Sequence, residues 1–228
     1  MTTAPRTRCN GHPFEGLPPL TRLDARMRAI AVLLSALAGF VDAIGFIASG
    51  GFFVSFMSGN STRLGIGIMT DRHAALLATG LILSFVAGVT LASLVRGRRD
   101  GAAWTVLLLV GLALALAAAL HRIVPAPWVL PIVALAMGAE NVAFAGQGQV
   151  VALTYMTGTL VRVGQLLAAA IAGGDRWGWA PFALMWAGLI TGGALGTWSA
   201  LVFGLDALWL AAALVTAIAF GMRRLKPD

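Results

Sequence analysis

The chain is poor in charge: only 11% of its 228 residues are charged, whereas 59% are hydrophobic. A typical soluble domain is about 25% charged and roughly 45–50% apolar. This composition excludes a soluble enzyme, a DNA-binding domain and a disordered chain, and it predicts a protein that lies mostly in the lipid bilayer. The excess of 16 Lys+Arg over 9 Asp+Glu therefore indicates orientation rather than a nucleic-acid partner, because basic residues accumulate in cytoplasmic loops.

Residue types that carry out most chemistry are scarce. The one cysteine, Cys9, permits no internal disulfide and no metal framework. The only lysine, Lys226, lies at the C-terminus, which excludes Ser–Lys and Schiff-base schemes inside the membrane. The three histidines lie in the tail or at the ends of apolar runs, and no metal-binding or phosphate-binding motif occurs. We expect no enzyme, metal or cofactor, although acid–base chemistry by Asp42 or Glu140 stays open.

Apolar runs of membrane-crossing length fill most of the chain between a polar tail (1–28) and a basic tail (223–228), both expected to be cytoplasmic. Backbone groups in lipid must be hydrogen-bonded internally, so these runs are predicted to be helices. No alternation typical of a β-barrel occurs. The runs are Ala29–Ser49, His73–Val95, Ala103–Leu120, Pro127–Ala145, Val150–Gly173, Pro181–Val202 and Asp206–Phe220.

A polar pattern inside this apolar sequence occurs twice, at 55–65 and 154–164. The matching pairs, each separated by 99 residues, are Met57 and Met156, Gly59 and Gly158, Arg63 and Arg162, and Gly65 and Gly164. Each copy is followed by two further apolar runs. We therefore expect an all-α integral membrane protein with two homologous halves, at 29–122 and 127–222, each with a polar, broken segment. Repeated halves recur in transporters, which bind their solute between the repeats.

The number of crossings in each half is open. If the polar segment crosses the membrane, each half has four spans, eight in total, and the repeats are parallel. If it is re-entrant, each half has three spans, six in total, and the repeats are inverted. The cluster Arg96, Arg98 and Arg99 would lie outside in the eight-span arrangement, so the positive-inside rule favours six.

Two signatures resemble those of a known family. The stretches 39–43 (Gly-Phe-Val-Asp-Ala) and 53–62 look like its first signature, and 153–160 (Leu-Thr-Tyr-Met-Thr-Gly-Thr-Leu) looks like its second. This family is the YoaK-like group of bacterial multi-pass membrane proteins, whose function is not established. Ser58 and Ser61 stand where threonines are expected, and they keep the hydroxyl groups. The resemblance implies an inner-membrane location and supplies no binding residues.

Four ionisable residues fall in or near the apolar segments: Asp42, Arg63, Glu140 and Arg162. Each costs roughly 2.5–3.5 kcal/mol at a helix centre, and such residues usually face a cavity or pair with one another. Because the acids and the arginines occupy near-equivalent places in the two halves, we expect a neutral, quasi-symmetric cluster. Either it binds a solute or ion, or it consists of structural ion pairs that fix helix register.

The glycines and hydroxyl residues of each motif suit a helix interruption or close helix packing. At an interruption, a half-helix N-terminus with a nearby arginine would favour an anion. The predicted substrate-binding residues are Asp42, Asn60, Thr62, Arg63, Glu140, Asn141, Thr157, Thr159 and Arg162.

A stripe of small residues, Gly188, Gly192 and Gly196, predicts a helix–helix contact within the chain or in a homo-oligomer; a channel lining is the weaker alternative. Two functions follow for the whole chain. The first is transport of a small solute, with an anion favoured, between the two halves. The alternative is a non-transport membrane scaffold with a structural charge cluster.

Overall fold

The structure, a computed structural model, describes residues 25–97, 103–143 and 156–224, and within these ranges it is helical without β-strands. The elements are α2 (Ala25–Ser49), α3 (Met57–Thr70), α4 (Arg72–Gly97), α5 (Ala103–Leu120), α6 (Ala126–Ala143), α7 (Met156–Ile171), α8 (Ala180–Phe203), the short 3-10 helix η1 (Gly204–Ala207) and α9 (Leu208–Arg224). The all-α membrane fold class is confirmed.

The helix boundaries follow the predicted apolar runs closely. α5 has the predicted limits, and α2 ends at Ser49 as predicted but begins at Ala25, inside the predicted tail. The rest of that tail, the last four residues and the stretch 144–155 lie outside the described residues. By length and composition, 5 helical segments could cross a membrane. One of them, Ala180–Arg224, has 45 residues, which at about 1.5 Å per residue is twice what a bilayer core needs.

A glycine pair ends α2 and reverses the chain. Gly50 and Gly51 have φ values of 69° and 121°, conformations that favour glycine because it lacks a Cβ. Their amides donate back to the Ile47 carbonyl at 3.3 Å and the Phe46 carbonyl at 2.8 Å. This is the hydrogen-bond pattern of a Schellman C-cap, and it directs the following loop back along α2.

The closest helix pair is α2 with α8, and glycines make the contact. A Cβ at Gly39 would overlap the backbone of Leu189, and one at Gly192 would overlap the backbone of Ala36. Gly188 faces Val32 and Gly196 faces Phe40. Residue numbers therefore increase in the same direction along both helices, and the two helices are parallel. The predicted stripe therefore forms the contact within one chain; a homo-oligomer through it stays a prediction.

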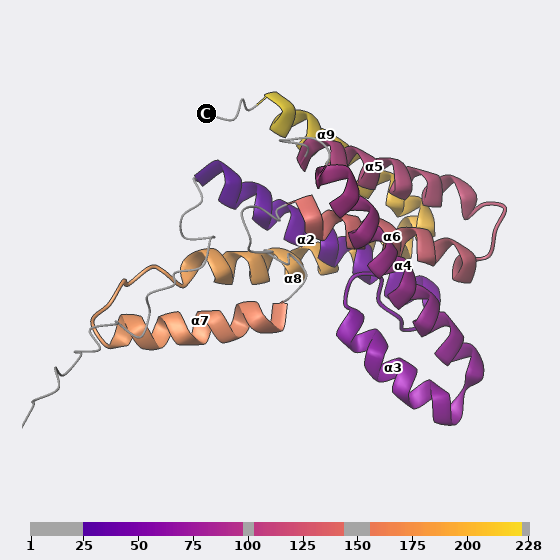
Figure 1. Cartoon of the computed structure of the whole chain (residues 1–228), viewed down its shortest axis with the longest axis horizontal. Helices are drawn as coiled ribbons and strands as arrows, with labels where there is room; N and C mark the ends of the chain where they lie inside the picture. Colours follow the sequence, from indigo (N-terminus) through magenta and orange to yellow (C-terminus); the bar gives the residue numbers. More distant parts are fainter. Residues whose placement is uncertain (1–24, 98–102, 144–155, 225–228) are drawn as a thin grey trace, which may run out of the picture.

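α4 and α6 pack in the same manner on the other side of the molecule. A Cβ at Gly88 would overlap the Leu135 carbonyl, and one at Gly138 would overlap the Phe85 carbonyl. Small residues let backbones approach this closely, and such approach supplies the van der Waals contact that joins helices in lipid. The two glycine contacts place α2, α4, α6 and α8 in one central bundle (Figure 1).

α5 and α9 pack against each other in antiparallel directions. At one end, the Arg223 guanidinium lies 5.2 Å from the centre of the Trp104 ring. At the other end, the Asp206 carboxylate is 2.9 Å from His121 Nε2 and 3.0 Å from an Arg122 nitrogen. Hydrogen bonds from His121 and then from Arg122 lower the pKa of Asp206 from its ordinary value. The ion pair thus joins the end of α5 to the turn between α8 and α9.

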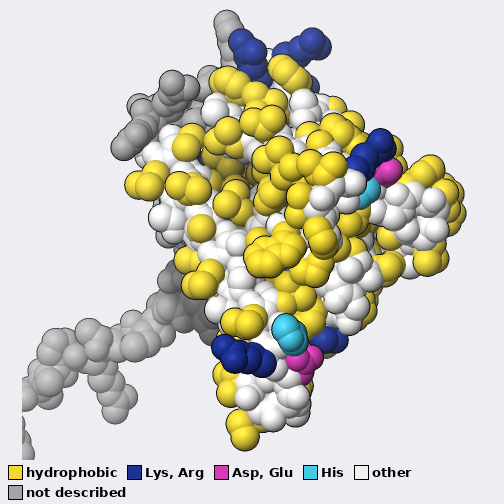
Figure 2. All heavy atoms as spheres, turned by 90° about the vertical axis from the view of Figure 1, so that its right-hand side faces the viewer, with side chains coloured by type: hydrophobic (Ala, Val, Ile, Leu, Met, Phe, Trp, Pro, Cys, Tyr) yellow, Lys and Arg dark blue, Asp and Glu magenta, His cyan; other side chains and the backbone are white. Residues whose placement is uncertain are grey.

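The surface is mostly apolar, with its charged groups in separate clusters. Figure 2 shows yellow hydrophobic side chains over most of one face, with charged groups at the top, on the right and near the bottom. Large apolar residues such as Leu201 (75% exposed) and Leu112 (67% exposed) lie on the outside of the bundle. An exposed apolar surface of this extent suits contact with lipid rather than with water.

The glycine contact between α2 and α8 can be tested with two neighbouring alanines. Gly192→Ala would force its new Cβ into the Ala36 backbone, whereas a Cβ at Gly193 has its nearest neighbour, the Gly39 carbonyl oxygen, at 3.7 Å. We expect Gly192→Ala to destabilise the detergent-solubilised protein by about 1–3 kcal/mol and Gly193→Ala to have little effect. Thermal unfolding measures both. Equal midpoints for the two variants would contradict the packing described.

Candidate functional site

The site is built around a loop that Asp42 holds against the middle of α2. Its carboxylate accepts hydrogen bonds from the Val54 amide at 2.8 Å, the Ser55 amide at 2.7 Å and the Ser55 hydroxyl at 2.6 Å. Asp42 lies about two helical turns before the end of α2, so the loop from 50 to 56 descends again to the level of this carboxylate before α3 begins. A break thus precedes α3, whereas the first motif itself is helical from Met57 onward and is not interrupted at Gly59.

Asn60 fixes the same loop from the α3 side. Its side-chain oxygen accepts from the Phe53 amide at 3.0 Å and its nitrogen donates to the Phe53 carbonyl at 2.6 Å. The side chain is fully buried. Predicted as a solute contact, Asn60 thus has both of its polar atoms engaged by the loop backbone. Likewise, the anion hypothesis requires backbone amides that are free to bind a solute. The Val54 and Ser55 amides of the loop instead donate to Asp42.

α3 is short for a membrane-crossing helix and packs against α4. Its 14 residues are fewer than the roughly 20 that a crossing helix needs. The Asp71 amide closes its last turn on the Gly67 carbonyl at 2.8 Å, and Gly67 packs against the backbone of Ala75 in α4. We call the loop 50–56 and α3 the re-entrant loop and helix, because the chain returns towards α2 in the loop and reverses again into α4; α3 projects to one side of the bundle in Figure 1.

Arg63 lies on aromatic rings. Its guanidinium carbon is 4.8 Å from the centre of the Phe52 ring and 5.9 Å from that of Phe46, distances suited to cation–π attraction. The residue borders a pocket of about 800 Å³, which α4 and α6 also line through His73 and Trp128. Within the described part of the chain no acid pairs with Arg63.

Glu140 is buried among the apolar residues of α6. Its exposed fraction is 0%, and neither carboxyl oxygen has a hydrogen-bond partner among the described residues. α6 is in contact with α2, the helix that carries Asp42. Of the four ionisable residues predicted as a cluster, these two acids therefore lie on helices that touch each other.

The remaining predicted residues are spread over α3, α6 and α7. Thr62 is exposed and its hydroxyl donates within its own helix to the Ser58 carbonyl, while the buried Asn141 donates to the Met137 carbonyl at 2.9 Å. Thr157 and Thr159 lie in the first turn of α7. Arg162 donates to the Gln165 side chain at 3.1 Å, and its buried Nε has no hydrogen-bond partner among the residues that the structure describes.

The expected pairing of acids with arginines is wrong for the described residues. The ion pairs found there join Asp206 to His121 and Arg122. Asp42 is instead held by loop amides, and Arg63 lies against rings. The physical reason is geometric: a carboxylate satisfied by three short hydrogen bonds needs no distant cation.

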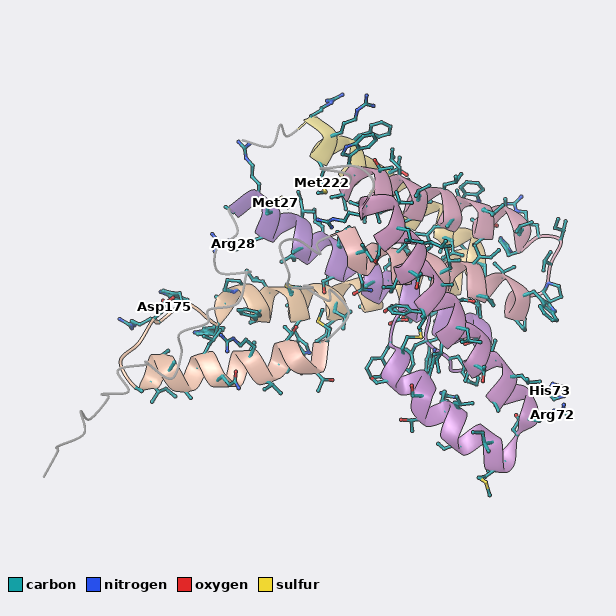
Figure 3. All side chains as sticks on the ribbon, viewed as in Figure 1. Met27, Arg28, Arg72, His73, Asp175 and Met222 are labelled. Carbon is teal, nitrogen blue, oxygen red and sulfur yellow. The ribbon has the colours of Figure 1, made fainter. Side chains whose placement is uncertain are left out.

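A second pocket, of about 640 Å³, lies between α2 and α8 and was not predicted. Arg28 and Trp177 border it. Figure 3 shows Arg28 at the opposite end of the molecule from His73, which borders the pocket of Arg63. Arg28 was assigned to the tail because it precedes the apolar run, and only the extension of α2 to Ala25 places it at a pocket.

A third pocket, of about 480 Å³, lies over Asp42. Its lining comes from α2, the re-entrant loop, the start of α7 and α8, and it is almost entirely apolar, with Phe46, Phe53 and Met156 among its walls. It is the place where the segments of the two sequence motifs come together. The Asp42 carboxylate is the charged group in this lining.

Comparison with known proteins identifies the chain's family. Residues 30–221 match the family described as "Protein of unknown function (DUF1275)". The chain is also 37% identical over 205 residues to "UPF0700 transmembrane protein RA0705" of Rhizobium meliloti (strain 1021), covering 86% of this chain and 87% of that protein. No solved structure is significantly similar. The chain belongs to this family of membrane proteins, which confirms the resemblance seen in its two signatures.

The role of Asp42 as the anchor of the loop is testable. Asp42→Ala leaves the Val54 and Ser55 amides without their acceptor, and hydrogen bonds to charged groups contribute about 1.5–3 kcal/mol each. We expect faster hydrogen exchange in the segment 50–56 and a lower midpoint of thermal unfolding. Asp71→Ala serves as the control, because that carboxylate accepts a bond from His73 in an exposed turn. Unchanged exchange in the Asp42 variant would refute the anchoring role.

Proposed function

We propose that this member of the family is a transporter in the inner membrane that carries a small anion between two inverted halves of one chain. The observation that carries the proposal is a pair of pockets at opposite ends of the molecule, each bordered by an arginine. Transporters built from inverted repeats bind their solute between the halves and open to one side at a time.

The helix contacts support two related halves. Gly39 packs on Leu189 as Gly138 packs on Phe85, and Gly192 packs on Ala36 as Gly88 packs on Leu135. The positions in α2 and α6 differ by 99 residues, and those in α8 and α4 differ by 104. The contact between α6 and α4 thus corresponds to the contact between α2 and α8. The difference between the two offsets means that the second half has five additional residues.

The antiparallel packing of α5 and α9 favours inverted halves. These are the last helices of the two halves, so parallel repeats would have made them parallel. In the inverted arrangement α2, α5 and α8 run in one direction and α4, α6 and α9 in the other. The short helices α3 (14 residues) and α7 (16 residues) then return without crossing, and the chain has six spans.

The two pockets occupy equivalent places in this scheme. Each lies between the first helix of one half and the third helix of the other. His73 and Trp128 border one of them, and the corresponding residues Trp177 and Ala29 border the other. A change in the packing of the two halves would open one pocket while it closes the other, which is the requirement for alternating access.

Arg63 supplies the chemistry for an anion. The Arg63 guanidinium lies over the Phe52 ring, and a guanidinium can bind an anion through two parallel N–H groups. Arg63 forms no ion pair with the described residues, and Asp71 is the acid that also borders this pocket. The pocket is large enough for a small anion with water, and an arginine next to low-dielectric aromatic walls attracts an anion strongly.

The six-span topology can be checked with reporter fusions. The proposal places both termini and the link around Asp100 in the cytoplasm, and the turn around Ile123 outside. Eight spans would exchange the two loops, with Asp100 outside and Ile123 inside. Paired fusions of a cytoplasm-active and a periplasm-active reporter at each position therefore give opposite outcomes, and an external Asp100 would end the inverted arrangement.

The anion site can be tested by ligand-induced stabilisation. Sodium chloride, nitrate, formate and phosphate are added in turn to purified protein, and thermal unfolding is recorded. An anion present at about 100 times its Kd adds about 2.7 kcal/mol, which raises Tm by roughly 5–10 °C in a protein of this size. We expect such a shift for at least one anion and its loss in Arg63→Gln.

Arg72→Gln is the matched control, since it removes the same charge nearby from an exposed residue that does not border the pocket. It should keep the shift, which also separates binding from the general stabilising effect of salts. The protective anion should then cross proteoliposomes containing wild-type protein, and its flux should fall at least tenfold with Arg63→Gln. If no anion protects, or both variants respond equally, the transport proposal fails and the scaffold alternative gains support.

A further inference from the structure

We propose that Glu140 carries a proton inside the bundle and that this proton is the coupling ion of anion transport. The inference rests on the proposed function for its second part, but the protonated side chain can be observed without any solute. It starts from one fact: a fully buried carboxyl group has no hydrogen-bond partner among the described residues.

A partnerless buried carboxylate ion would be very costly. Removing an ionised carboxylate from water requires compensation by hydrogen bonds or an opposite charge, and without them the group takes up a proton instead. The neighbours of Glu140 along α6 are Ala139 and Asn141, with Ala136 and Met137 one turn earlier; all of them are buried. Nothing in this part of the described bundle stabilises a negative charge on Glu140.

The elements packed against α6 supply no cation for Glu140. α5 contains no charged residue. α4 contributes Arg96, whose guanidinium donates to the Val142 and Ala143 carbonyls and so caps the end of α6. α2 contributes Asp42, which is itself an acid and therefore cannot act as a counter-charge. The other charged or titratable groups of the described α2 and α4, namely Arg26, Arg28, Arg72 and His73, lie in the first turns of those helices.

A proton at this position can affect the rest of the site through described contacts. Glu140 lies in α6, which contacts α2, and Asp42 of α2 holds the re-entrant loop through Val54 and Ser55. That loop leads into α3, which carries Arg63 at the larger pocket. Loss of the proton would place two negative charges close together and would weaken the arrangement that positions Arg63.

Coupling to a proton also suits an anionic cargo. A proton that moves with a monovalent anion makes the transported pair neutral, so the step performs no work against the membrane potential. Glu140 takes up one proton from one side of the membrane and releases it to the other side. The proton transfer makes and breaks only an O–H bond. No oxidant, reductant or further cofactor is needed.

Infrared spectroscopy tests the proton directly. Wild-type protein at neutral pH should show the carbonyl stretching band of a protonated carboxyl group. Glu140→Gln should remove that band, whereas Asp175→Asn, at an exposed acid, should retain it. Because glutamine is neutral and of similar size, Glu140→Gln should unfold at the wild-type temperature or above. A band unchanged by Glu140→Gln, or a variant that unfolds well below wild type, overturns the proton site.

Proton uptake tests the coupling. With an anion that protects the wild type, proteoliposomes should take up protons together with the anion. Glu140→Gln should lose this uptake at least tenfold while the anion still raises its unfolding temperature. Anion flux with unchanged proton uptake in Glu140→Gln overturns the coupling. Failure of every anion to bind, with the infrared band lost in Glu140→Gln, leaves the proton site standing and defeats the transport proposal instead.

Discussion

Backbone contact through glycine is the constraint on which the rest of this structure depends. In lipid there is little hydrophobic gain in bringing helices together, so close packing must supply the attraction. Gly192 on Ala36 and Gly88 on Leu135 permit that approach. These two contacts set the positions of α2 and α6, and thereby the places of Asp42 and Glu140, inside a bundle whose buried residues are mostly apolar.

Within this frame each charge is accommodated separately. Asp42 is held by loop amides, Arg63 by aromatic rings and Arg96 by the last carbonyls of α6. Glu140 alone among these has neither donor nor counter-charge in the described bundle. The contrast matters because a satisfied group holds structure in place, whereas an unsatisfied one inside a membrane is a candidate for function.

The sequence predicted much of the fold and part of the site. Hydropathy placed the helices to within a few residues, but the polar motif around Asn60 is helical, and the break in the chain precedes it. The motif residues were assigned to a solute, however, whereas Asn60 and Asp42 engage the loop backbone. Sequence spacing shows that polar groups are near the same depth, but it does not show which backbone amides a folded loop presents to them.

By itself the sequence determined that this protein is a helical membrane protein, where its helices lie and where they can approach closely. Those properties are local, because they follow from runs of apolar residues and from single glycines. Only the tertiary structure decided which group each charge meets, that α5 and α9 are antiparallel, and that Arg28 and Arg63 border pockets at opposite ends. These features depend on contacts between residues far apart in the chain, and no local pattern encodes them.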